Sequence, residues 1–257
     1  MKLAWLSDTH FDTVREEALC TLSLELEGYE QILVTGDIGL PSNLEESIAW
    51  LRKRARTHFV RGNHDFYRSS FAREDGRRIE GDLRQVPYVQ LTEKTVLVGT
   101  DGWYDGGYAR MQESELVISD FYAIEEITQH LRDPEGRARV IKERAKMYAM
   151  ELQEKIDAAI RDTPCHHILV ATHVPPFRES SRAPNGALSD RHWAPYFSSK
   201  ITGEVLREAA KANPKHRFTV YCGHTHTEHY FHAQDRLECF VHGSDYGHPL
   251  VKTIEVA

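Results

Sequence analysis

Short apolar runs alternate with amphipathic segments along the first third of the chain. The runs at 2–8, 31–37 and 57–65 are short and mostly apolar, and each ends in polar residues, as buried strands do. Between them, 13–28 and 42–55 carry apolar residues at helical spacing. The order strand, helix, strand, helix, strand predicts right-handed crossovers and a mainly parallel sheet, which is the arrangement of an α/β fold.

Local signals predict where these two helices begin. Thr13 with Glu16, and likewise Ser42 with Glu45, have the spacing of capping boxes, in which each side chain satisfies a backbone N–H group at the helix start. Gly28 is a typical residue after the last turn of a helix. We therefore expect a side-chain cap at the start of both helices.

The middle of the chain changes character. Two more strands are expected at 86–91 and from 95, and 113–162 is helical and highly charged with one apolar face. One apolar face needs a surface to cover it, so we interpret 113–162 as a helical insertion packed on a single domain of residues 1–257.

The last third returns to strands, with a long loop at 178–200. Its expected strands are 166–176, 217–226, 229–234, 237–243 and 250–256, and its expected helix is 201–213.

Composition narrows the class of protein only slightly. The chain has 257 residues and a formal net charge of −7, which disfavours a protein whose main role is to bind nucleic acid. No apolar run reaches the ~18–20 residues that cross a membrane, and the N-terminus lacks the apolar core of a signal peptide. We interpret the four cysteines as reduced core thiols in a cytoplasmic protein.

Residues able to bind metal follow five of the predicted strands. They are Asp8 and His10; Asp37; Asn63, with His64 and Asp65; His173; and His224 and His226 in the segment GHTH. In open α/β sheets, sites form at the carboxyl ends of the strands, so these side chains are expected to converge. Carboxylate, imidazole and amide groups without thiolate suit Mn²⁺, Fe, Zn²⁺ or Ni²⁺. Without His64 and Asp65 the set still holds seven ligands, which are too many for one ion and indicate two ions.

The ordered series of motifs resembles the calcineurin-like metallophosphoesterase superfamily. The motifs are D-x-H, GD, GNHD, TH and GHTH, in the order of that family, between residues 5 and about 230. The resemblance implies a four-layer α/β/β/α sandwich of two mixed sheets. It also implies a first metal held by Asp8, His10, Asp37 and His226, and a second held by Asp37, Asn63, His173 and His224. A phosphomonoester or phosphodiester would then be hydrolysed by in-line attack of a hydroxide that bridges the two ions.

The resemblance gives His64 a role at the leaving group. In the family the corresponding histidine lies beside the phosphate, where it protonates the leaving oxygen or stabilises phosphoryl charge. Asp65 is expected to help orient groups of the site. The protein-phosphatase branch has an aspartate and an arginine where this chain has Leu40 and Pro41, which argues against a phosphoserine/threonine phosphatase and leaves the partner of His64 open.

The sequence does not select the substrate. Tyr104, Arg110, Arg191, His192 and the neighbouring Trp193 are candidate contacts to a small-molecule phosphate ester, because an arginine can pair with phosphate oxygens. Loops so rich in aromatic residues are equally expected as covers that pack on the domain. His242, Asp245 and His248 are interpreted as polar loop residues, with an approach to the site left open. A catalytically silent metal-binding scaffold, a nuclease of the same superfamily and a lipid-precursor pyrophosphatase are the alternative functions. Manganese is the expected metal, Mg²⁺ is also considered, and the oligomeric state stays open.

Overall fold

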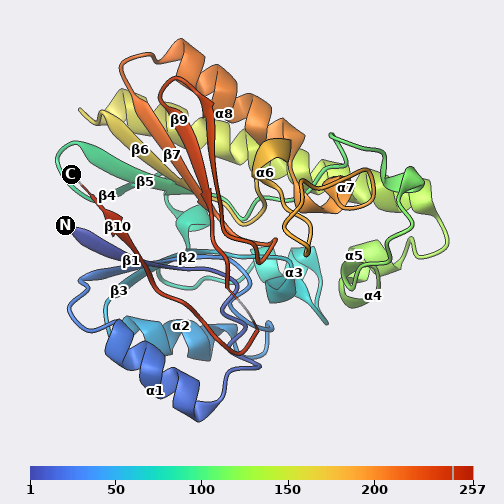
Figure 1. Cartoon of the computed structure of the whole chain (residues 1–257), viewed down its shortest axis with the longest axis horizontal. Helices are drawn as coiled ribbons and strands as arrows, with labels where there is room; N and C mark the ends of the chain where they lie inside the picture. Colours follow the sequence, from blue (N-terminus) through green and yellow to red (C-terminus); the bar gives the residue numbers. More distant parts are fainter. Residues whose placement is uncertain (245, 257) are drawn as a thin grey trace.

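The structure, a computed structural model, describes residues 1–244 and 246–256. The first of its two sheets has four strands in the order β10-β1-β2-β3 (Figure 1). Their bounds are Lys2–Leu6 for β1, Gln31–Thr35 for β2, Arg56–Val60 for β3 and Lys252–Glu255 for β10. Strands β1, β2 and β3 are parallel, and β10 runs antiparallel beside β1, so this sheet is mixed.

The second sheet has six strands in the order β4-β5-β6-β7-β9-β8. Their bounds are Val89–Gln90 for β4, Thr95–Gly99 for β5, His167–Ala171 for β6, Arg217–Cys222 for β7, His229–Gln234 for β8 and Leu237–Val241 for β9. Strands β5, β6, β7 and β9 are parallel, while β4 and β8 pair antiparallel at the two edges. This sheet is therefore mixed as well.

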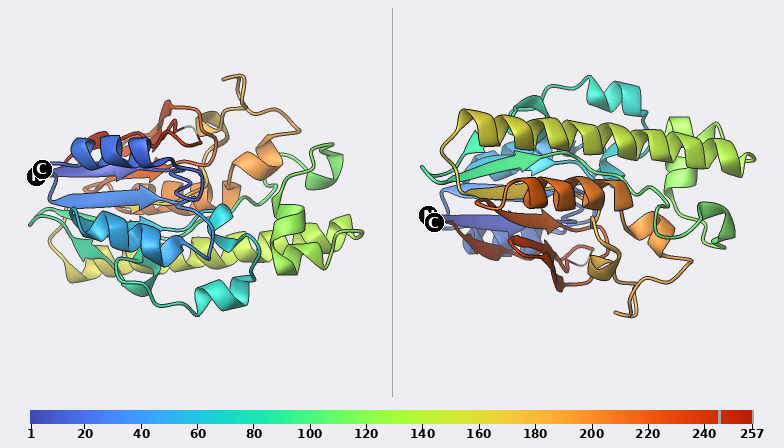
Figure 2. Two further views of the ribbon diagram at one scale, coloured as in Figure 1. Left: turned by 90° about the horizontal axis from the view of Figure 1, so that it is seen from below. Right: turned by 90° about the horizontal axis from the view of Figure 1, so that it is seen from above.

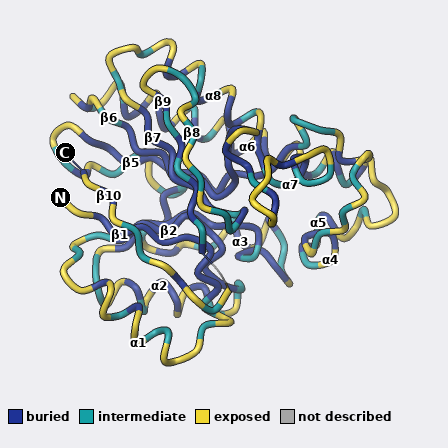
Figure 3. The backbone as a smooth tube through the Cα atoms, viewed as in Figure 1, coloured by how far each residue is buried: buried dark blue, intermediate teal, exposed yellow. Residues whose placement is uncertain are grey.

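Alternate side chains of the strands supply two different cores. Leu3 and Trp5 of β1 pack between the sheets, together with residues of β5, β6 and β7. Ala4 and Leu6 of β1 point the other way, against α1 (Glu16–Glu25) and α2 (Leu44–Arg52). The central strands are consequently buried on both faces, which explains their nearly continuous apolar sequences (Figure 3).

Helices α6 (Pro134–Asp162) and α8 (Lys200–Ala212) cover the outer face of the six-stranded sheet (Figure 2). Leu152 and Ile156 of α6 join Leu206 of α8 in a cluster with the side chains of β5, β6 and β7. The order of layers is thus helix, sheet, sheet, helix, and the expected four-layer sandwich of two mixed sheets is confirmed.

The segment expected to be a helical insertion has two parts. Helices α4 (Asp120–Ala123) and α5 (Glu125–Thr128) lie at the far end of the molecule, beside the start of α6 (Figure 1). The later part of α6 connects β5 to β6, which are parallel neighbours, and it belongs to the outer helix layer.

Three smaller expectations are corrected by the structure. Helix α1 begins at Glu16 without a side-chain cap, because the hydroxyl of Thr13 donates to the carbonyl of His10. Helix α2 begins at Leu44, also without a side-chain cap at its N-cap residue, and no capping box forms at Ser42. Cys20 is exposed rather than buried in the core, whereas the other three cysteines are buried and all four are free. Among the described residues, no helix is both long and apolar enough to span a membrane.

Candidate metal centre

Backbone hydrogen bonds join the loops that follow the strands. The amide of Asp8 donates to the carbonyl of Gly36 at 3.0 Å, and the amide of His10 donates to that of Asp37 at 2.9 Å. On the other sheet, the amide of Gly223 donates to the carbonyl of His173 at 2.9 Å. Because the amide of His224 also donates to the Asp8 carboxylate at 2.9 Å, the loops of both sheets meet at one place.

The backbone at this place is left-handed at residues other than glycine. Five of the seven candidate ligands have positive φ: Asp8 at 51°, His10 at 41°, Asp37 at 49°, His224 at 69° and His226 at 52°. Such conformations cost free energy and persist where the surrounding structure enforces them, which is common at functional sites. Gly223 is required for a different reason, because a Cβ there would collide with Ser7 and the Asp8 carboxylate.

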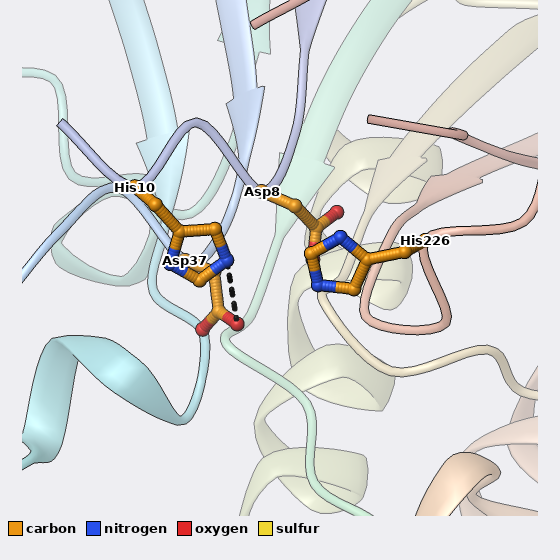
Figure 4. A group of neighbouring side chains, drawn as sticks. All are labelled: Asp8, His10, Asp37 and His226. Atoms are coloured by element: carbon orange, nitrogen blue, oxygen red, sulfur yellow. Dashed lines mark ion pairs between the residues drawn. The ribbon is translucent and has the colours of Figure 1, made fainter. Parts of the chain in front are cut away.

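The first cluster contains Asp8, His10, Asp37 and His226 (Figure 4). Each offers one potential ligand atom, and all four atoms lie within 4.8 Å of one another. Nε2 of His10 is 3.8 Å from Oδ2 of Asp37, and Nε2 of His226 is 3.7 Å from Oδ1 of Asp8. This is the set that the family resemblance implies for the first metal.

The second cluster lies on the other side of the Asp37 carboxylate. Nε2 of His173 is 3.4 Å from Oδ1 of Asp37 and 3.2 Å from Oδ1 of Asn63. Nδ1 of His224 is 3.1 Å from the same Asn63 oxygen and 3.2 Å from Nε2 of His173. Ligands about 2.1 Å from one ion lie about 3.0–3.4 Å apart, so these separations fit a shared ion. Each oxygen of Asp37 faces one cluster.

Backbone carbonyls determine which ring nitrogen of three histidines carries the proton. Nδ1 of His173 donates to Thr35, Nε2 of His224 to Tyr196 and Nδ1 of His226 to Ser244, at 2.9, 2.8 and 2.7 Å. A carbonyl only accepts, so in each neutral imidazole the other nitrogen has a free lone pair. In His224 and His226 that lone pair points into a cluster of acceptors, which is an arrangement that a cation stabilises, and His173 offers the same lone pair when its imidazole is neutral.

His10 gives a direct test of whether these residues fit a metal. Its side chain is fully buried, and within residues 1–244 and 246–256 neither ring nitrogen has a hydrogen-bond partner. A buried polar atom without a partner is costly, and a metal ion would provide one. Burial also lowers the pKa of His10 to about 4, which keeps the imidazole neutral as a ligand must be.

The charges of the second cluster are consistent with a cation. Burial lowers the pKa of His173, but the adjacent Asp37 carboxylate more than offsets this, and the pKa is raised to about 10. Burial and the neighbouring His173 lower the pKa of His224 to about 4. In the protein without metal, a proton on His173 therefore balances Asp37, and a bound ion would take over that role.

Asp120 holds the amide of Asn63, and sequence reasoning missed it. The Nδ2 group of Asn63 donates to Oδ1 of Asp120 at 3.0 Å and to the hydroxyl of Tyr67 at 3.1 Å, so its oxygen faces the histidines. The Tyr67 and Tyr104 hydroxyls donate to the same carboxylate at 2.6 and 2.7 Å. No local signal marks Asp120, because its partners lie up to 57 positions away.

The structure gives Asp65 and His64 different surroundings. The buried Asp65 carboxylate accepts backbone N–H groups of Ile38, Gly39 and Gly62 at 2.8–3.2 Å, so it joins two site loops and does not face open space. Burial and nearby Asp37 raise the pKa of Asp65 to about 7. His64 is partly exposed, and its Nε2 is 3.9 Å from Oδ2 of Asp37.

Tyr246 covers the first cluster and was also missed. Its ring stacks on His10 with 4.1 Å between centroids and on His226 with 4.8 Å. Its hydroxyl is 3.5 Å from Nε2 of His64. The polar loop around it was recognised in the sequence, but the residues singled out there were others. Of those, His242 is buried against Trp5, and Asp245 lies outside the described residues.

Of the candidate substrate contacts, Tyr104 lies beside the second cluster, where its ring stacks on that of His224 with 6.2 Å between centroids. Tyr104 is 1% exposed, and its hydroxyl donates a hydrogen bond to Asp120 rather than facing solvent. Arg110 is exposed and pairs with Glu113. Arg191 and His192 contact each other on an outer loop, where Trp193 packs on Phe197. In the described part of the chain, no hydrogen bond or ion pair joins Arg110, Arg191 or His192 to a candidate metal ligand.

Comparison with known proteins agrees with this geometry. A family model described as calcineurin-like phosphoesterase matches residues 1–228. A phosphopantetheinyl hydrolase from Mycobacterium tuberculosis has a similar structure, with a TM-score of 0.67 and 14% identity over 98% of this chain and 95% of that one. A dimetal phosphatase from Danio rerio gives 0.56 and 15% over 94% and 86%. No curated protein sequence matches. The chain belongs to the calcineurin-like phosphoesterase family and is a metal-dependent phosphoric ester hydrolase.

Proposed function

We propose that the chain hydrolyses a small phosphomonoester or phosphodiester at a centre of two divalent ions that share Asp37. The observation that carries this proposal is the division of the Asp37 carboxylate, with Oδ2 toward His10 and Oδ1 toward His173. When bound, the two ions supply a nucleophilic water and neutralise charge that develops on the phosphoryl group. The donors are nitrogen and oxygen without thiolate, which suits Mn²⁺ together with Fe, Zn²⁺ and Ni²⁺, and manganese is the metal we propose first.

In this proposal His64 is the general acid that protonates the leaving group. Its ring lies between Tyr67, on which it stacks at 4.2 Å, and His10, at 4.6 Å between centroids. Its amide donates to Oδ1 of Asp37 at 2.9 Å, which holds the residue beside the shared carboxylate. A partly exposed imidazole in this position reaches both substrate and solvent protons, as a general acid must. Asp65 is a positioning residue, because it joins the backbone directly after Asp37 to the backbone of Gly62.

Two other functions give different expectations. A scaffold that has lost catalysis would be expected to lack ligands, whereas all seven candidate ligands converge in this chain. A nuclease would need a basic surface, and the net charge of −7 argues against one. A cytoplasmic location and a small-molecule substrate stay predictions from the sequence.

The test combines metal analysis with hydrolysis of two simple esters. Purified protein reconstituted with Mn²⁺ is expected to hold two ions per chain and to hydrolyse para-nitrophenyl phosphate, its bis-ester or both. A phosphopantetheine ester belongs in the same panel, since a protein of similar structure carries that activity in its name. Asp37→Asn should lose both metal content and activity. Metal-loaded protein that is inert on every ester would favour the scaffold.

A second variant separates the role of His64 from metal binding. His64→Ala should retain both ions and lose about 10²–10⁴ in kcat on an alkyl phosphate, the usual range for a general acid. The loss should shrink on para-nitrophenyl phosphate, because nitrophenolate leaves without a proton. Full activity of His64→Ala on the alkyl phosphate would contradict the role.

A further inference from the structure

A pocket of about 600 Å³ is lined in part by Tyr67, the residue on whose ring His64 stacks. Its walls come from the loop after β2, the segment after the GNHD motif, and α3 (Phe71–Asp75) with the residues that follow it. Tyr67 lines the pocket and stacks on the His64 ring, so the pocket and the proposed general acid share one wall. Neither the metal ligands nor the proposed proton transfer uses this space.

Arginines dominate the charge of the pocket. It is lined by Arg68, Arg73 and Arg77 against a single acid, Glu74. Arg77 is already paired, with Glu74 at 2.9 Å and with Glu45 at 2.9 Å. Arg68 and Arg73 are exposed, and across residues 1–244 and 246–256 no acid pairs with either guanidinium. Two uncompensated cations therefore line one pocket in a chain whose net charge is −7.

The acids around the pocket are occupied elsewhere. Asp75 is bound by Arg84 and Arg144, neither of which lines the pocket. Glu126 accepts the backbone N–H groups of Phe71 and Ala72 at 2.9 and 3.2 Å. An anion from solvent would thus meet arginines whose charge has not been neutralised.

The backbone of Arg68 is held in one unusual conformation. Its φ is 60°, which is left-handed, and its amide donates to the carbonyl of Ala123 at 2.6 Å. The amide of Glu125 donates in turn to the carbonyl of Ser69 at 3.0 Å. Helices α4 and α5 therefore fix the point from which the Arg68 side chain leaves the backbone, and such enforced conformations are frequent where a ligand binds.

We propose that this pocket binds a second anionic group of the substrate, a phosphate or a carboxylate, carried by the leaving alcohol. The proposal rests on the proposed phosphoesterase function, and it adds which esters are preferred. His64 protonates the leaving oxygen, so the leaving group is the part of the substrate nearest the wall that His64 and Tyr67 form. A guanidinium offers paired N–H groups that match the oxygens of either anion.

The test uses substrates that differ only in the second anion. Alkanediol bisphosphates with two to six carbons are compared with the monophosphates of the same diols, and phosphate-bearing carboxylic acids of equal length form a third arm. The measured quantity is the ratio of kcat/KM for the dianionic ester over its monophosphate. At the best chain length we expect a ratio of roughly 10 to 100, the value of a charge-assisted hydrogen bond. The third arm shows whether phosphate or carboxylate is the preferred second anion.

Two variants and one control assign the preference to the pocket. Arg68→Gln and Arg73→Gln should each lower the ratio about tenfold, and raised salt should lower it in the wild type. Arg78→Gln, an exposed arginine of the same region outside the pocket lining, should leave the ratio unchanged. Metal content and circular dichroism check that the variants are folded and loaded.

The outcomes separate this inference from the proposed function. Hydrolysis of monophosphates with a ratio near one at every chain length would overturn the inference and leave the phosphoesterase function standing. A preference that survives in both arginine variants would also overturn it, because the second anion would then bind elsewhere. Failure to hydrolyse any ester would contradict the proposed function itself.

Discussion

At the scale of single residues, the protein prepares its metal ligands before any ion binds. Carbonyl oxygens hold the ring protons of His224 and His226 away from the clusters, and the carbonyl of Thr35 fixes the orientation of the His173 ring. Asp120 does the same for the amide of Asn63 by accepting its N–H group. Ligands held in this way lose little freedom on binding, and their supporting groups are typically worth 10–100-fold in metal affinity.

Asp120→Ala tests the support of Asn63. Without the carboxylate, the Asn63 amide and the Tyr67 and Tyr104 hydroxyls lose a shared buried acceptor. We expect the affinity for one of the two ions to fall about 10- to 100-fold, measured by titration of the metal-free protein. Asp120→Asn keeps one acceptor oxygen and should recover most of this loss. Unchanged affinity for both ions in Asp120→Ala would show that Asn63 needs no such support.

At the scale of elements, the ends of parallel strands determine where the chemistry occurs. Strands β1 and β2 end in the loops that carry Asp8, His10 and Asp37, and β6 and β7 end in those that carry His173 and His224. Left-handed residues turn the loops after β1, β2 and β7 directly behind the strand, so their side chains reach the gap where the two sheets meet. Helix α1 begins only at Glu16, because the residues before it form this loop.

Substitutions in helix α6 test whether the segment at 113–162 is an appended insertion or part of the core. Leu152 is fully buried in the cluster between α6, α8 and the six-stranded sheet. Leu152→Ala should therefore lower the free energy of unfolding of the whole chain by about 2–5 kcal/mol, measured in urea. Met150 lies on the same helix and is 56% exposed, so Met150→Ala should change the free energy of unfolding by less than about 0.5 kcal/mol. Equal unfolding midpoints for the two variants would support an appended insertion.

At the scale of the whole molecule, the two sheets pack face to face and bury histidines far from the site. His58 of β3 is 3% exposed and its Nε2 lies 2.9 Å from Oε1 of Gln31. Burial, with a smaller effect of Arg56, lowers the pKa of His58 to about 4. The folded protein thus keeps this imidazole neutral at a pH where the unfolded chain, with a pKa near 6.5, is already protonated.

This difference predicts a loss of stability in mild acid. Between about pH 6.5 and pH 4 the unfolded state binds the additional proton, so the free energy of unfolding falls as the pH falls. For His58 the loss should reach about 2–3 kcal/mol at pH 4.5. His58→Gln, compared with wild type at pH 7 and 4.5 in urea with a chelator present, should remove that part of the loss. His166→Gln, at an exposed position, is the control, and equal pH dependence in all three proteins would contradict the assignment.

Local patterns were sufficient for the elements and for the ligand candidates, and insufficient for their support. Apolar runs followed by Asp, His or Asn mark a strand and the loop after it within ten residues, so Asp8, Asp37 and His224 were recognisable. Asp120 supports Asn63, which is 57 positions away, and Tyr246 contacts His64, which is 182 positions away, and nothing near either residue in the sequence indicates this. The burial of Tyr104, which is 1% exposed, could not be read from the sequence for the same reason, because it depends on distant parts of the chain.

The sequence by itself determined the fold class, the family and the order of the ligand-bearing loops, since each depends on spacing along the chain that short-range sterics and hydrophobic burial translate into strands and turns. Only the tertiary structure decided which oxygen of Asp37 faces which histidine, which ring nitrogens carry protons, and which arginines near His64 lack a partner. These properties arise from contacts between segments that are close in space and distant in sequence, and the packing of the two sheets sets them.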